Sequence, residues 1–157
     1  MTSVTTSSPA ETERLGRRIG RAITSPTAVL ISGEMGVGKT VLVKGIAQGL
    51  DVKDEVISSS FLTMRAYSGR MPFIHVDLYK LEGRADAYEL GLADLPDDAV
   101  IAIEWAQRFP LGMGLPALSV EMRFLAGENE RTMDLDVGAL DDGELRRKLE
   151  RALASRT

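Results

Sequence analysis

Apolar residues return every three or four positions in three segments, and this spacing predicts three amphipathic helices. The first helix follows Ser8-Pro9-Ala10-Glu11, in which the serine can cap, the proline suits a first turn and the glutamate completes a capping box. The second ends near Gly49, a residue suited to a C-cap, and the third begins after Asp141 or Asp142. The three apolar faces are Leu15, Ile19, Ala22 and Ile23; Val43, Ile46, Ala47 and Leu50; and Leu145, Leu149 and Leu153.

Short apolar runs and alternating segments predict the strands. Two continuous runs, Ala28 to Ile31 and Val100 to Ile103, are typical of strands buried on both faces. Two segments joined at Ser68-Gly69-Arg70-Met71-Pro72 predict a hairpin. The other expected elements are that hairpin's strands (61–67 and 73–79), two alternating strands (118–124 and 132–137), a short helix (86–90) and loops at 51–60 and 107–116.

The order of these elements favours an α/β fold. A buried strand, a glycine-rich loop and an amphipathic helix follow one another near the N-terminus, as in a P-loop NTPase. We therefore predict a three-layer P-loop NTPase-like fold with a mostly parallel central sheet, an antiparallel hairpin and helices on both faces. Residues 1–157 are expected to form a single domain, with residues 1–8 flexible.

Composition narrows the classes of function. With 44% hydrophobic and 27% charged residues, the chain is typical of a soluble protein. No apolar run approaches the roughly 18 residues needed to cross a bilayer, and no secretory signal pattern opens the chain. The net charge of −4 disfavours nonspecific binding to nucleic acid. Cysteine is absent and His75 is the single histidine, so thiolate sites and three-histidine zinc sites within the chain are excluded.

The segment from Gly33 to Thr40 matches the phosphate-binding pattern G-x-x-x-x-G-K-[ST]. Its glycines allow backbone N–H groups to turn inward and, with the N-terminus of the next helix, form an anion cradle. Lys39 places a positive charge at the β and γ phosphates, and the Thr40 hydroxyl is a hard ligand for Mg²⁺. We expect ATP or ADP with Mg²⁺ to contact Glu34, Met35, Gly36, Val37, Gly38, Lys39, Thr40 and Val41.

Two carboxylates are candidates for the metal and for hydrolysis. Glu104 directly follows the second buried run, where a P-loop ATPase carries the acid that organises magnesium and water. Asp77 shares one strand face with His75 and Tyr79, which indicates either a site or a hydrogen-bonded cluster. We interpret His75 as a structural partner of Asp77 rather than as a base.

Two other features each have both a functional and a purely structural interpretation. The serines at 58–60 could reach the γ-phosphate as a nucleotide switch, or form a polar loop. The basic residues of the first helix (Arg14, Arg17, Arg18 and Arg21) and of the last (Arg146, Arg147, Lys148 and Arg151) are typical of solvated helix faces, with a docking surface for a partner or RNA as the alternative.

Taken together, these motifs resemble the TsaE (YjeE) family. The resemblance covers roughly residues 10–135 and is carried most specifically by His75-Val76-Asp77-Leu78-Tyr79 and Ile103-Glu104-Trp105. Further matches are the P-loop, the serine-rich segment that ends in Phe61, and Glu89-Leu90-Gly91-Leu92.

The resemblance implies a cytoplasmic bacterial ATPase that acts with TsaB and TsaD proteins to make threonylcarbamoyladenosine beside the anticodon of tRNA. In that family TsaD carries out the transfer and the ATPase resets the complex, so contact with tRNA would be indirect. It also implies that Thr40, Asp77 and Glu104 organise magnesium. Lys39 would bind phosphate, Glu104 would act in hydrolysis and Trp105 would respond to nucleotide.

Two positions depart from the family pattern, and two other functions compete with it. Ser58-Ser59-Ser60-Phe61 lacks the usual proline of the switch, and Lys80 stands where an arginine is common. These departures concern the switch more than nucleotide binding. A small-molecule kinase could use the same P-loop, although no lid segment is evident. A GTP switch is disfavoured because the guanine-reading [N/T]-K-x-D pattern is missing.

Overall fold

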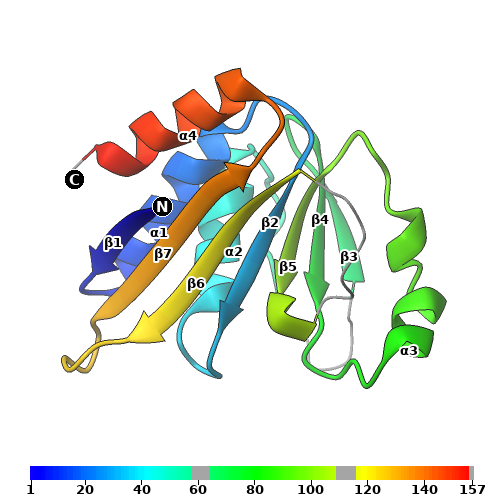
Figure 1. Cartoon of the computed structure of the whole chain (residues 1–157), viewed down its shortest axis with the longest axis horizontal. Coiled ribbons are helices and arrows are strands. Elements are labelled where there is room, and N and C mark those ends of the chain that lie inside the picture. Colours follow the sequence, from blue (N-terminus) through cyan, green and yellow to red (C-terminus); the bar gives the residue numbers. More distant parts are fainter. Residues whose placement is uncertain (58–63, 109–115, 156–157) are drawn as a thin grey trace.

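The computed structural model describes residues 1–57, 64–108 and 116–155. Within them, one sheet has the strand order β1-β7-β6-β2-β5-β4-β3 (Figure 1). Its strands are β1 (Thr2–Thr6), β2 (Thr27–Gly33), β3 (Met64–Ser68), β4 (Pro72–Asp77), β5 (Val100–Glu104), β6 (Ala117–Phe124) and β7 (Arg131–Ala139). The helices are α1 (Pro9–Ala22), α2 (Lys39–Gly49), α3 (Arg84–Glu89) and α4 (Gly143–Ala154), with short 3-10 turns η1 (Leu92–Asp94) and η2 (Ala106–Arg108).

The centre of the sheet is parallel and its flanks are antiparallel. Strands β6, β2, β5 and β4 run parallel to one another, with β2 between β6 and β5. The predicted hairpin is present, because β3 pairs antiparallel with β4, and β6 and β7 form a second antiparallel pair. These pairings confirm the predicted fold class.

The N-terminal residues correct one expectation. Residues 1–8 were expected to be flexible, but Thr2–Thr6 forms strand β1 and pairs antiparallel with β7 from Thr2 opposite Leu135 to Thr6 opposite Arg131. The segment is rich in threonine and carries one valine, so its β propensity is satisfied once β7 offers a free edge. That edge is supplied by a strand more than 120 positions away, which local pattern reading could not anticipate.

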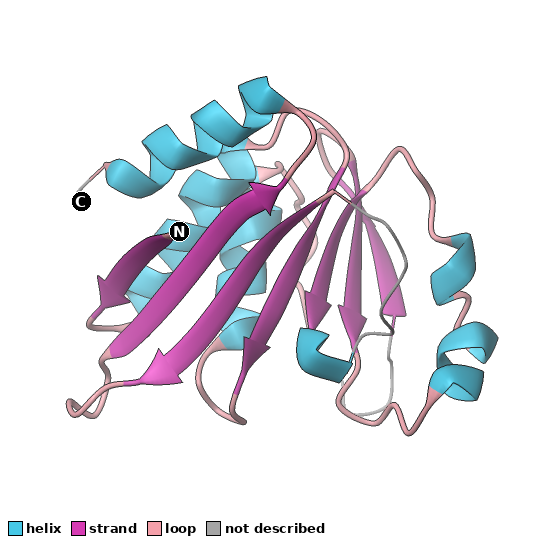
Figure 2. Cartoon of the chain, in the orientation of Figure 1, coloured by secondary structure: helices cyan, strands magenta, loops and turns pink. Residues whose placement is uncertain are grey.

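Helices cover both faces of the sheet, as predicted (Figure 2). On one face, α1, α2 and α4 pack over the larger apolar core, which includes Ile19, Ile46 and Leu149. On the other face, α3 and η1 cover β4 and β5 through Ala87 and Leu92. The alternation of β4 follows this division, because Phe73 belongs to the first core while Ile74 and Val76 belong to the second.

Helices α1 and α2 approach each other through glycines. A Cβ atom on Gly45 would lie 2.2 Å from the Glu13 carbonyl oxygen, and one on Gly49 would lie 2.3 Å from the Arg17 oxygen. Gly49 was expected to be a C-cap, but it is the last residue of α2 and its role is this close approach. The left-handed position after the helix is taken by Asp51, at φ 61°.

The predicted helix starts are confirmed in detail. Ser8 caps α1 by accepting a hydrogen bond from the Glu11 N–H at 3.2 Å, and Glu11 reaches back to the Ser7 N–H at 2.7 Å. Of the two aspartates considered for α4, Asp142 is the cap. No helix in the described ranges combines the length and apolar character needed to cross a membrane.

Candidate functional site

The glycine-rich loop joins β2 to α2 at the carboxyl end of the parallel strands. Gly33, Gly36 and Gly38 all have positive φ angles, of 152°, 77° and 107°. Such angles strain residues that carry a Cβ atom, so the motif glycines are required by the path of the loop. Gly38 is also the left-handed residue that precedes the first turn of α2, which leaves the N-terminal N–H groups of that helix directed at the loop.

Lys39 extends back across this loop. Its Nζ atom donates to the carbonyl oxygens of Gly33, at 2.9 Å, and Glu34, at 2.8 Å, and it lies 4.1 Å from the centre of the Trp105 ring. The side chain is buried, and desolvation lowers the pKa of Lys39, although the charges of Glu104 and Asp77 oppose that shift. The loop thus holds an ammonium group that carries a desolvation cost and has neutral hydrogen-bond partners.

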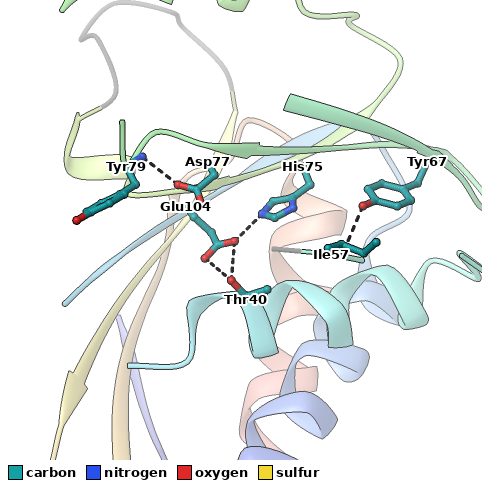
Figure 3. Close-up of polar contacts among 7 residues, drawn as sticks. All are labelled: Thr40, Ile57, Tyr67, His75, Asp77, Tyr79 and Glu104. Atoms are coloured by element: carbon teal, nitrogen blue, oxygen red, sulfur yellow. Dashed lines mark hydrogen bonds and ion pairs between the residues drawn. The ribbon is translucent and has the colours of Figure 1, made fainter. Parts of the chain in front are cut away.

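The two candidate carboxylates lie side by side because their strands are parallel and in register. Asp77, at the end of β4, is opposite Glu104, at the end of β5. Glu104 is buried, and its two oxygens accept from the Thr40 hydroxyl at 2.8 and 3.0 Å (Figure 3). The fold therefore brings the first turn of α2 and the ends of two strands together, as open α/β sheets do at their ligand sites.

His75 corrects the partner predicted for it. Its Nε2 atom lies 2.5 Å from Oε2 of Glu104, whereas Asp77 accepts from the Tyr79 backbone N–H at 2.9 Å (Figure 3). Positions 75 and 77 share a strand face but stand about 6–7 Å apart along it, and the short Asp77 side chain folds onto the Tyr79 backbone instead. The neighbouring strand supplies a nearer carboxylate, and strand pairing was not derivable from the sequence.

Asp77 sits in an environment that disfavours its charge. Burial raises the pKa of its carboxyl group above the usual 3.8, and the nearby Glu104 charge adds to that effect. The Tyr79 N–H and the charges of His75 and Lys39 act in the opposite direction. A cation bound between Asp77 and Glu104 would relieve the repulsion between them.

An aromatic pair borders the lysine. Tyr79 and Trp105 have ring centres 5.0 Å apart, and the Arg108 guanidinium lies 5.4 and 5.3 Å from the two rings. Trp105 has a φ of 58°, a left-handed conformation that is uncommon for a large side chain and frequent at functional sites. Sequence reasoning placed neither Tyr79 nor Arg108 among the site residues, although the alternation of His75, Asp77 and Tyr79 was a signal for Tyr79.

The glycine-rich loop, the two carboxylates and the aromatic pair line a common cavity of about 400 Å³. Glu34 and Val37, which were predicted to bind nucleotide, do not line it. The Val37 side chain is buried, and its N–H donates to the Glu34 oxygen within the loop. The predicted serine switch at 58–60 lies outside the described residues. The lining residues are Met35, Gly36, Gly38, Lys39, Thr40, Val41, Asp77, Tyr79, Glu104 and Trp105.

The donor set fits magnesium held jointly with phosphate. Thr40, Asp77 and Glu104 offer hard oxygen atoms beside a buried ammonium and a glycine loop. No group of three or more histidine or acidic side chains in the described part of the chain is close enough to hold a metal alone. Mg²⁺ in nucleotide sites is typically bound through one or two carboxylates together with phosphate oxygens and water, so this arrangement suits it.

The chain is similar to proteins of one known family. The sequence model of the family described as "Threonylcarbamoyl adenosine biosynthesis protein TsaE" matches residues 6–133. A tRNA threonylcarbamoyladenosine biosynthesis protein TsaE from Treponema pallidum is 31% identical over 123 residues, which are 78% of this chain and 91% of the relative. One from a Nostoc species is 33% identical over 117 residues, 70% of this chain and 71% of the relative.

A solved structure supports the same relationship. Bacillus subtilis YdiB superposes with a TM-score of 0.66 at 26% identity, over 95% of this chain and 93% of that one. The agreement extends beyond the P-loop, since the matched residues 6–133 also include the strands that carry Asp77 and Glu104. The chain therefore belongs to the TsaE family of tRNA threonylcarbamoyladenosine biosynthesis proteins.

Proposed function

We propose that this protein is an Mg²⁺-dependent ATPase that supports threonylcarbamoyl modification of the tRNA adenosine next to the anticodon. Its slow hydrolysis of ATP would reset a complex of TsaB-like and TsaD-like proteins in the cytoplasm, with tRNA contacted only through that complex. The observation that carries the proposal is the hydrogen bond between the Thr40 hydroxyl and the buried Glu104 carboxylate, beside Lys39. It joins the phosphate loop to an acidic strand end at one cavity.

The chemistry follows from the placement of these groups. A water molecule attacks the γ-phosphorus in line, the bond between that phosphorus and the β,γ-bridging oxygen breaks, and ADP and inorganic phosphate form. Lys39 and the loop N–H groups stabilise the charge that develops on the phosphate oxygens. Thr40, Asp77 and Glu104 would hold Mg²⁺, which would neutralise the charge of the phosphate groups. Glu104 is also placed to orient the attacking water.

Slow hydrolysis by the isolated protein follows from the cavity lining. Among the described residues that line the cavity, Lys39 is the only basic side chain. Arg108, which lies beside the aromatic pair and does not line the cavity, donates to the Tyr79 carbonyl oxygen instead. Without an arginine at the γ-phosphate, intrinsic hydrolysis by P-loop proteins is several orders of magnitude slower. A partner protein would complete the site.

Phosphate release from ATP with Mg²⁺ tests the proposal. The rate should be slow for the protein alone and should rise when the TsaB and TsaD proteins of the same organism are added. Rapid turnover by the isolated protein would contradict a partner-dependent ATPase. ATP binding without any rise on adding the partners would contradict the resetting role, and phosphorylation of a small acceptor would then favour the kinase alternative.

A further inference from the structure

The buried histidine of β4 is not accounted for by the roles assigned above. His75 is 5% exposed, does not line the cavity, and lies on the sheet face that α2 covers. In the described part of the chain, the one ion pair or hydrogen bond of its side chain is the 2.5 Å contact with Glu104 (Figure 3). A histidine that served only to fill the core would not need to direct a ring nitrogen at a carboxylate.

The contact controls a flexible acid. Glu104 is the last residue of β5, and its side chain has three rotatable bonds. The residue is 2% exposed. Its Oε2 atom is shared by His75 Nε2 and the Thr40 hydroxyl, so the two donors approach from β4 and from α2. A buried carboxylate without donors would carry a large desolvation penalty and would rotate to find one.

The pairing of the strands makes this contact possible. The residue opposite His75 on β5 is Ala102, whose small side chain lies on the same sheet face. The imidazole can therefore extend along β5 toward Glu104, two residues further on. Lys39 does not take the place of His75, because its ammonium binds the Gly33 and Glu34 carbonyl oxygens.

We propose that His75 is a positioning residue that holds the Glu104 carboxylate in the orientation needed for metal organisation and ATP hydrolysis. The proposal rests on the ATPase function proposed above. Because the carboxylate accepts, Nε2 is the nitrogen that carries the hydrogen. Removal of a group that hydrogen-bonds to a metal-ligating side chain typically lowers metal affinity or activity by about 10–100-fold.

The pairing itself can be tested without any nucleotide. His75 is the single histidine in the sequence, so protein labelled with nitrogen-15 at histidine gives ring-nitrogen signals, Nδ1 and Nε2, from one imidazole only. We expect a hydrogen on Nε2 that exchanges slowly with water, and we expect Glu104→Ala to make that exchange fast. A hydrogen on Nδ1 alone, or a signal that Glu104→Ala leaves unchanged, would overturn the inference.

Substitutions at His75 test the functional consequence. Gln retains a nitrogen donor near the Nε2 position, whereas Leu has a similar bulk and no donor. In single-turnover hydrolysis with Mg²⁺ and the partner proteins, His75→Leu should lower the rate constant by at least about tenfold, and His75→Gln should restore most of it. ATP affinity measured in EDTA should stay unchanged in both. Wild-type hydrolysis by His75→Leu would refute the proposal.

Two controls separate positioning from stability. Phe73→Leu loosens the core two residues earlier on the same face of β4, and should lower stability without changing the hydrolysis rate constant of the folded protein. In a Glu104→Gln background, His75→Leu should cause little further loss of activity, because no carboxylate remains to be held. Equal losses in both backgrounds would mean that His75 acts through stability and would overturn the inference.

Failure of the wider proposal would look different. If wild-type protein neither bound nor hydrolysed ATP, the ATPase function would be wrong, yet the imidazole signal would still report the pairing with Glu104. If ATP bound and was hydrolysed but the His75 variants matched wild type, the ATPase function would stand and the positioning role alone would be rejected.

Discussion

At the scale of single residues, the site consists of charged groups, and neighbouring hydrogen-bond partners offset the energetic cost of burying them. The buried ammonium of Lys39 is held by two carbonyl oxygens, and the buried carboxylate of Glu104 by a hydroxyl and an imidazole. Asp77 is less well compensated, because within the described residues its carboxylate accepts a hydrogen bond from one backbone N–H alone, and burial raises its pKa. These differences lead to distinct expectations for the three residues.

Lys39→Ala should weaken ATP binding by more than about tenfold, or about 1.4 kcal/mol, because the charge at the β and γ phosphates is lost. Glu104→Ala should spare binding relative to hydrolysis. Calorimetric titration and single-turnover hydrolysis measure the two effects. Circular dichroism serves as the control for folding, and the fold should tolerate Lys39→Ala because desolvation already disfavours the charged ammonium. Equal loss of binding in the two variants would contradict the role of Glu104.

The raised pKa of Asp77 predicts that the stability of the nucleotide-free protein depends on pH. Because its folded pKa is raised, Asp77 binds its proton more tightly in the folded than in the unfolded protein. Its favourable contribution is complete below the usual value of 3.8 and is lost as the pH rises through the folded pKa. Asp77→Asn removes this dependence.

The measurement is the difference in urea unfolding free energy between Asp77→Asn and wild type at two pH values. That difference should shift in favour of the variant between about pH 4 and about pH 7. Groups that do not interact with Asp77 titrate alike in both proteins and cancel. A shift in favour of wild type would show that the pKa of Asp77 is lowered by folding.

At the scale of elements, the phosphate loop is held by the packing of the helix that follows it. Helix α2 lies against α1 through Gly45 and Gly49, where the backbones approach too closely for side chains. The same loop is also tied to β7, because Arg131 donates to the Val37 carbonyl oxygen at 3.0 Å. The position of Lys39 and Thr40 thus depends on glycines far from the cavity.

Gly45→Ala should lower the free energy of unfolding by about 2–3 kcal/mol, because a Cβ atom would overlap backbone atoms of α1. The matched control is Gly143→Ala in α4, where the nearest atom lies 3.6 Å away on Arg147. There the greater helix propensity of alanine should leave stability unchanged or raise it by under about 1 kcal/mol. Urea denaturation of both variants compares them, and similar effects would show that α1 and α2 can move apart freely.

At the scale of the whole molecule, elements beyond the family match complete the fold. Strand β1 and helix α4 lie almost entirely outside residues 6–133, yet β1 covers the edge of β7 and α4 contributes Leu145, Leu149 and Leu153 to the larger core. Several basic residues of the helices form ion pairs within their own helix, such as Arg17 with Glu13 and Lys148 with Glu144. This pairing favours a solvated face over an RNA-binding one.

Removal of residues 1–6 should lower the urea midpoint and promote association, because the edge of β7 would be left unpaired. Unfolding curves and light scattering at several concentrations measure these effects. Thr5→Ala, on the exposed side of β1, is the control that keeps the strand and should leave both properties close to wild type. A truncated protein as stable and monomeric as wild type would show that β1 does not protect the sheet.

Local pattern by itself determined the helices, most strands, the glycine loop and the positions of Lys39, Thr40 and Glu104. Periodicity and turn chemistry act over a few residues, so a sequence displays them directly. Only the tertiary structure decided that Glu104 pairs with His75, that Thr2–Thr6 is a strand, and that Gly49 serves packing. Each of these depends on a partner from a distant segment. Strand order, register and helix approach are set by burial and hydrogen bonding over the whole fold, so they cannot be read from any one segment.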